Sequence, residues 1–133
     1  MTSPERFPVL SSLPPPSDLF KSTAPYILTV SLYDQNLVVH CSHEPTLKLL
    51  KGYLERHQWT KAHSVVSSKL TLVESDFCPG TMDTLIVSPN SSWERNCKVN
   101  PTVILAFIEG VVGYRMVSTT GSIWMYRRTT LFT

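Results

Sequence analysis

The chain has 133 residues, 42% of them hydrophobic and 17% charged, with a formal net charge of +2. This length and composition indicate one folded domain and exclude a disordered chain. So small a net charge gives no bulk evidence for nucleic-acid binding. We find no secretory signal and no apolar stretch of about 20 residues, the length that spans a bilayer. The odd set Cys41, Cys78 and Cys97 is therefore expected to be reduced, in the cytosol or the nucleus.

Residues 1–25 differ in composition from the rest, because they hold six of the ten prolines. Such a segment is expected to be a disordered, extended tail before one domain at residues 26–133. Pro14, Pro15 and Pro16 are candidates for docking a partner that has an aromatic groove. The alternative interpretation is a flexible leader.

A β-hairpin is predicted at about residues 26–41, because two runs of strand formers flank the turn signal Asp34-Gln35-Asn36. An amphipathic helix of about 14 residues is predicted next, with Ser42 as its N-cap. Its apolar face holds Leu47, Leu50, Leu54 and His57, and its polar face holds Lys48, Lys51, Glu55 and Arg56.

Two strands are predicted at residues 65–74 and 84–88, around a turn at Pro79-Gly80, and residues 89–98 are predicted to form an exposed loop. Residues 100–113 are the most apolar segment and predict a buried core helix that begins at Asn100-Pro101 and ends at Gly113. A strand is the alternative there. A second hairpin is predicted at residues 114–119 and 123–132. The order predicts an α+β fold with a mostly antiparallel sheet.

Potential metal ligands concentrate at His40-Cys41-Ser42-His43-Glu44, with His57, His63, Cys78 and Cys97 elsewhere. The paired knuckles of structural zinc sites are missing, and on a strand His40 and Cys41 point to opposite faces. The alternative is a strand end with a buried cysteine and solvent-facing histidines. Cys41 as a thiol nucleophile lacks a glycine-rich elbow. We therefore expect no metal, no cofactor and no enzyme, and a Cys/His enzyme remains a third interpretation.

Trp124, Tyr126, Arg127 and Arg128 form the main surface candidate. Aromatic rings beside a basic pair suit an anionic membrane interface, and they suit single-stranded nucleic acid as well. In the alternative interpretation, Trp124 and Tyr126 face the core of a hairpin. Lys48 and Lys51 are a second basic strip, or simply the solvated face of a helix.

Three short segments resemble the matrix proteins of rhabdoviruses, especially the lyssavirus type. LPPPSD at residues 13–18 looks like the PPPEY-like budding motif, LKLLKGYL at 47–54 is similar to the first domain helix, and IWMYRRTTLF at 123–132 is similar to a strand with tryptophan, tyrosine and two arginines. The tyrosine of the budding motif is missing, which puts tyrosine-dependent recruitment of host ligases in doubt. The chain is also shorter than a typical matrix protein and has no lysine-rich N-terminus.

The resemblance implies a non-enzymatic structural or interaction protein that self-associates and binds a nucleocapsid or host protein. It implies peripheral contact with anionic membrane in the host cytoplasm or the virion, and the nucleus is not excluded. Pro14, Pro15 and Pro16 are then the docking residues, and Lys48, Lys51, Arg127 and Arg128 the anionic-surface residues. The second interpretation is a small nucleic-acid-binding module that uses Trp124 and Tyr126. No small-molecule substrate is indicated.

Overall fold

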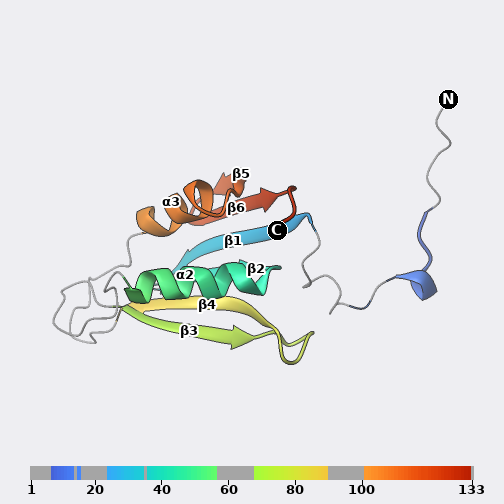
Figure 1. Ribbon diagram of the computed structural model, residues 1–133, viewed down its shortest axis with the longest axis horizontal. Coiled ribbons are helices and arrows are strands. Elements are labelled where there is room, and N and C mark those ends of the chain that lie inside the picture. Colours follow the sequence, from blue (N-terminus) through green and yellow to red (C-terminus); the bar gives the residue numbers. More distant parts are fainter. Residues whose placement is uncertain are drawn as a thin grey trace.

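A computed structural model describes residues 7–13, 15, 24–34, 36–56, 68–89 and 101–132. The described residues form a six-stranded, entirely antiparallel sheet with two α-helices (Figure 1). The elements are β1 (Tyr26–Tyr33), β2 (Asn36–Cys41), α2 (Glu44–Arg56), β3 (Ser68–Glu74), β4 (Met82–Pro89), α3 (Thr102–Gly110), β5 (Arg115–Thr120) and β6 (Ile123–Arg128), after a short 3-10 turn, η1 (Leu10–Ser12). The predicted α+β fold is therefore confirmed.

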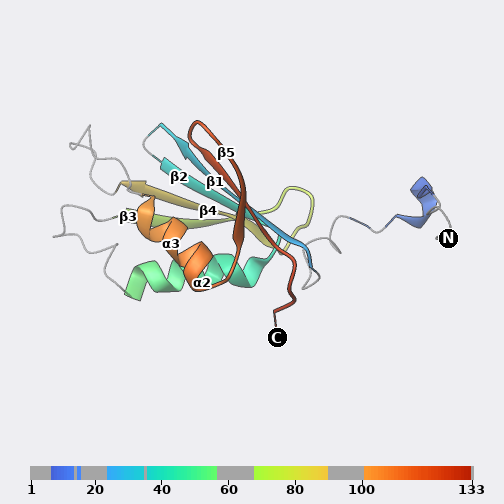
Figure 2. The same cartoon turned by 90° about the horizontal axis from the view of Figure 1, so that it is seen from above.

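The strand order across the sheet is β3-β4-β2-β1-β6-β5. Both helices cover the same face, with α2 over β2 and β4 and α3 nearer β1 and β6 (Figures 1 and 2). The core lies between this face and the helices, because alternate strand residues point toward it. Its buried side chains are Tyr26, Leu28, Val30, Leu37, Val39, Cys41, Leu85, Val87 and Tyr126 from the sheet, and Leu47, Leu50, Leu54, Ile104, Phe107 and Ile108 from the helices.

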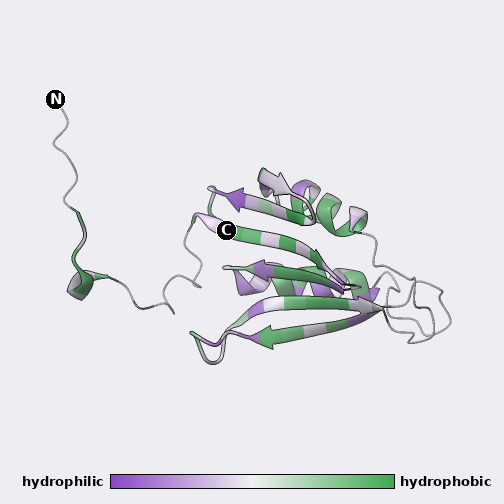
Figure 3. Ribbon diagram, turned by 180° about the vertical axis from the view of Figure 1, so that it is seen from behind, coloured by the Kyte–Doolittle hydropathy of each residue, from purple (hydrophilic) through white to green (hydrophobic). Residues whose placement is uncertain are grey.

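Neither of the two α-helices in the described part of the chain lies on the opposite face of the sheet (Figure 3). Hydrophobic and hydrophilic residues alternate along its strands, as expected for a sheet that is buried on one side only. Some hydrophobic side chains on this face are exposed, among them Ile27, Ile123 and Met125. Each of them alternates along its strand with residues that point to the core.

The predicted core helix is confirmed as α3, but it is shorter than expected, and two residues whose helical spacing predicts a place on its apolar face, Val103 and Val111, are not buried. Ile104, Phe107 and Ile108 are buried, whereas Val103 and Val111 are exposed. The helix ends at Gly110. The chain then turns through Gly113, whose φ of 72° suits glycine, and the N–H of Tyr114 donates to the carbonyl of Ile108 at 3.0 Å.

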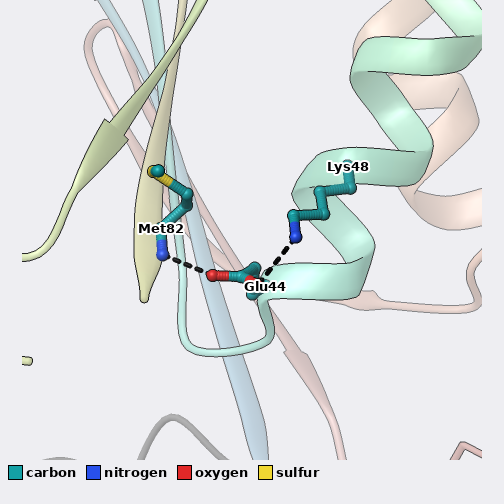
Figure 4. A network of polar contacts seen from close by, with 3 residues as sticks. All are labelled: Glu44, Lys48 and Met82. Atoms are coloured by element: carbon teal, nitrogen blue, oxygen red, sulfur yellow. Dashed lines mark hydrogen bonds and ion pairs between the residues drawn. The ribbon is translucent and has the colours of Figure 1, made fainter. Parts of the chain in front are cut away.

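Helix α2 is confirmed with its apolar face at Leu47, Leu50 and Leu54. The predicted Ser42 cap is wrong, because Ser42 Oγ accepts the N–H of Ile27 at 2.9 Å and so completes the end of the β1–β2 hairpin instead. Glu44, in the first turn, accepts the N–H of Met82 at the start of β4 and pairs with Lys48 Nζ at 3.0 Å (Figure 4). The hydrogen bond from Met82 makes the larger contribution, and together with the Lys48 contact it holds the pKa of Glu44 below its usual value.

Several predictions lie outside the described residues: most of the tail, residues 57–67 with His57 and His63, and residues 90–100 with Cys97 and the proposed Asn100 cap. The domain is described from Tyr26, where β1 begins.

Candidate functional site

The β5–β6 hairpin places two arginines directly opposite each other. It starts as a regular hairpin, with Thr120 opposite Ile123 and Ser118 opposite Met125. A β-bulge between Met116 and Ser118 then shifts the register by one residue. As a result Arg115 lies opposite Arg127 instead of Arg128.

Arg115 and Arg127 are both exposed, and neither has an ion-pair partner among the residues that the structure describes. Residues opposite each other in an antiparallel pair have Cβ atoms about 5 Å apart, and like charges there repel. The two positive charges of Arg115 and Arg127 therefore repel each other across the hairpin. A glutamate in place of either arginine would remove this repulsion. Repulsion of this kind is offset when an anion binds between the two guanidinium groups.

A surface cavity of about 370 Å³ lies at this end of the hairpin, which we call the arginine cavity. The hydrophilic end of β6 next to it is purple in Figure 3. The described residues that line the cavity are arginine, threonine, valine and glycine, and none of them is acidic. The lining is Gly113, Arg115, Val117, Arg127, Arg128, Thr129 and Thr130.

Arg128 differs from its neighbour Arg127 because successive strand residues face opposite sides of the sheet. Its Nη1 donates to the carbonyl of Val112 at 2.9 Å, and its guanidinium lies 4.0 Å from the centre of the Phe132 ring. Its buried Nε has no hydrogen-bond partner in the described part of the chain. Arg128 also lines the cavity, but its guanidinium is held by Val112 and Phe132, whereas Arg127 is exposed.

The other predicted basic residues lie elsewhere. Lys48 and Lys51 are on α2, which packs on β2 and β4 at a distance from the β5 edge of the sheet (Figure 1). Each also has a carboxylate one helical turn away: Lys48 pairs with Glu44, and Lys51 with Glu55. The structure does not bring these lysines together with Arg127 and Arg128 into one basic surface.

The predicted aromatic pair faces the core. Tyr126 is 1% exposed, and Trp124 is half-buried against the hydrophobic cluster. The alternative interpretation, in which the two rings face the core of the hairpin, is therefore confirmed, and a surface position of Tyr126 is wrong, because the alternation that exposes Arg127 turns Tyr126 inward. A base cannot stack on this ring in the folded protein. In the proline segment the structure describes only Pro15, which is exposed; Pro14 and Pro16 lie outside the described residues.

A buried polar network joins four residues that we did not predict to act together. Cys41 Sγ lies 3.5 Å from Tyr114 Oη, which lies 3.1 Å from Thr46 Oγ1, and Thr46 Oγ1 lies 2.8 Å from His43 Nδ1. The expectation of a solvent-facing His43 is wrong: it is 6% exposed and stacks on Phe132 with ring centres 4.7 Å apart. The exposed His40 does fit that expectation.

The electrostatics of this network disfavour reactivity. Burial raises the pKa of the Cys41 thiol and the pKa of Tyr114, and burial together with the nearby Arg128 charge lowers the pKa of His43. A nucleophilic cysteine needs the opposite shift, toward the thiolate. Among the described residues no three His, Cys, Asp or Glu side chains gather as a metal site. The network joins Tyr114 through Thr46 to His43, on which Phe132 stacks, and so links the residues after β6 to the core.

Comparisons with protein-family models, with curated protein sequences and with solved structures found no match to this chain. Among the described residues no helix is both long and apolar enough to cross a membrane.

Proposed function

We propose that this chain is a non-enzymatic interaction protein that contacts an anionic partner surface through the β5–β6 hairpin, in the manner of a viral matrix-type protein. The observation that carries the proposal is the exposed cross-strand pair of Arg115 and Arg127, which lacks an acidic partner among the described residues. Arg127 belongs to the segment that resembles a matrix-protein strand. Arg115 was not among the residues selected from the sequence.

An anionic membrane surface is the partner that this geometry favours over nucleic acid. Tyr126 is buried, so the stacking platform of a single-strand binder is missing from this hairpin. Peripheral attachment needs only exposed cations near the headgroups. Self-association and binding of a nucleocapsid or host protein, including docking through Pro14, Pro15 and Pro16, are part of the same proposal and rest on the resemblance alone.

Liposome flotation tests the proposal. The full chain should float with vesicles that contain 30% phosphatidylserine and remain unbound with neutral phosphatidylcholine vesicles. Each basic residue near an anionic membrane contributes about 1 kcal/mol, so Arg127→Gln should weaken binding about fivefold, and added salt should weaken it further.

Lys69→Gln is the matched control, because Lys69 is an exposed cation on β3, at the opposite edge of the same sheet. It should bind as the wild type does. Equal losses in the two variants would show a general charge effect and would contradict a site on the hairpin. Stronger binding to a single-stranded oligonucleotide than to the anionic vesicles would favour the nucleic-acid interpretation.

A further inference from the structure

We propose that the arginine cavity is a discrete site for one phosphate monoester group, held between the side chains of Arg115 and Arg127, with Arg128 also part of the lining. This inference rests on the proposed function and goes beyond it, because it names the ligand chemistry. A general anionic surface attracts any negative charge, whereas this site selects the phosphate monoester.

The first argument is the placement of the two arginine side chains. In a regular continuation of the hairpin Arg115 would lie opposite Arg128, whose guanidinium is already bonded to the carbonyl of Val112. The bulge at Val117 moves Arg115 opposite Arg127 instead. Bulges re-aim side chains and are frequent beside binding sites. Here the bulge pairs two exposed guanidinium groups that lack a protein anion in the described residues.

The second argument is the chemistry of the cavity wall. Guanidinium groups are planar forks of N–H donors that match the oxygen atoms of phosphate. Thr129 and Thr130, which follow the last residue of β6, also line the cavity, and their hydroxyl groups are donors of the same kind. No carboxylate of a described residue is part of the lining. The volume of about 370 Å³ lies at the lower end of the range for ligand sites, which suits a small headgroup.

The third argument separates the phosphate monoester from other anions. A phosphate monoester has a charge of about −1.5 to −2 near neutral pH and three terminal oxygens. Two arginines in register can bind different oxygens of one such group, so that both forks are used at once. A phosphatidylserine headgroup has a smaller net charge and its own ammonium group, which the cationic cavity repels.

The test compares vesicles of equal total charge that contain either phosphatidic acid, a phosphate monoester lipid, or phosphatidylserine. The full chain should bind the phosphatidic acid vesicles at least tenfold more tightly. Arg115→Gln and Arg127→Gln should each remove most of this preference, and Lys69→Gln should keep it. Arg127→Lys retains the charge but not the fork, so it should bind phosphatidylserine as the wild type does and lose much of the preference for phosphatidic acid.

Titration with inorganic phosphate, at ionic strength matched with chloride, separates a lipid headgroup from a free phosphate. Shifts of the Arg115 and Arg127 side-chain NMR signals at millimolar phosphate would assign the site to soluble phosphate groups as well. Shifts with phosphatidic acid vesicles alone would assign it to the lipid.

Equal binding to the two kinds of vesicle would overturn the phosphate site and leave the anionic-surface function standing. No binding to either vesicle, with no phosphate shifts, would overturn both. Circular dichroism on each variant verifies that the fold is retained, and the charge-preserving Arg127→Lys keeps the test decisive if a glutamine variant is unstable.

Discussion

Gly113→Ala tests the local geometry that fixes Arg128 beside the arginine cavity. Gly113 has a φ of 72°, and a Cβ added there would lie 2.5 Å from Arg128 Nη1. The left-handed backbone costs a non-glycine residue about 1–2 kcal/mol. The Cβ also displaces the guanidinium from the Val112 carbonyl and from the Phe132 ring, and losing contacts of this kind on a half-buried side chain costs about 1–2 kcal/mol more.

The expected loss in the free energy of unfolding is therefore about 2–4 kcal/mol, measured by urea denaturation with a constant m-value. Gly121→Ala is the matched control, because Gly121 has a φ of 57° but nothing within 4 Å of an added Cβ. It should lose only the backbone contribution of about 1–2 kcal/mol.

A double-mutant cycle isolates the contribution of the clash. In an Arg128→Met background the guanidinium is gone, so Gly113→Ala should cost no more than Gly121→Ala. Equal costs for the two glycine variants in the wild-type background would refute the reasoning. A difference between them that persists without Arg128 would refute it as well.

Four further variants test other parts of the structure. Phe107→Ala should destabilise the protein by about 3–5 kcal/mol in the same denaturation assay, whereas Val111→Ala, on a side chain that is 62% exposed, should change it by less than about 0.5 kcal/mol. Gly52→Ala should stabilise by about 1 kcal/mol, because Gly52 is exposed inside α2 and an added Cβ meets nothing within 4 Å. Burial and the nearby Arg128 charge lower the pKa of His43 below 6.5, so the unfolded chain binds that proton more readily than the folded protein. Thermal stability should be full above about pH 6.5 and fall as the pH drops through the folded-state pKa, and His43→Gln should flatten this part of the melting-temperature profile.

Both predicted hairpins and the α2 and α3 helices could be read from the sequence because their signals are local. Alternation over residues 26–41 and helical spacing at Ile104, Phe107 and Ile108 depend on neighbours within one segment. The faces to which the β6 side chains point could also be predicted from the sequence, because alternation alone turns Tyr126 and Arg127 to opposite faces of the sheet.

The burial of His43 could not be read in the same way. Its environment is made by Tyr26, Thr46, Tyr114 and Phe132, and three of these lie far from it in the chain. A histidine after a strand, without those partners, is expected to face water. Phe132 in particular closes over His43 only because β6 pairs with β1, a contact across most of the chain.

Arg115 was not predicted as a site residue, for a different reason that concerns how basic surfaces are predicted from a sequence. Lys48 and Lys51 stood out because they lie close together in the sequence, yet on a helix the residue four positions away supplies each with a carboxylate. On a strand the nearest side chain belongs to another segment, and a bulge decides which one it is. Alternation along a strand predicts that one of Arg127 and Arg128 carries the partner side and the other lies nearer the core. No local pattern marks the bulge at Val117, so the sequence could not show that Arg115 is the residue opposite Arg127. The Arg128 guanidinium is held by Val112 and Phe132, and Arg115 lies opposite Arg127, so the pair with uncompensated charge depends on strand register and not on adjacency in the sequence.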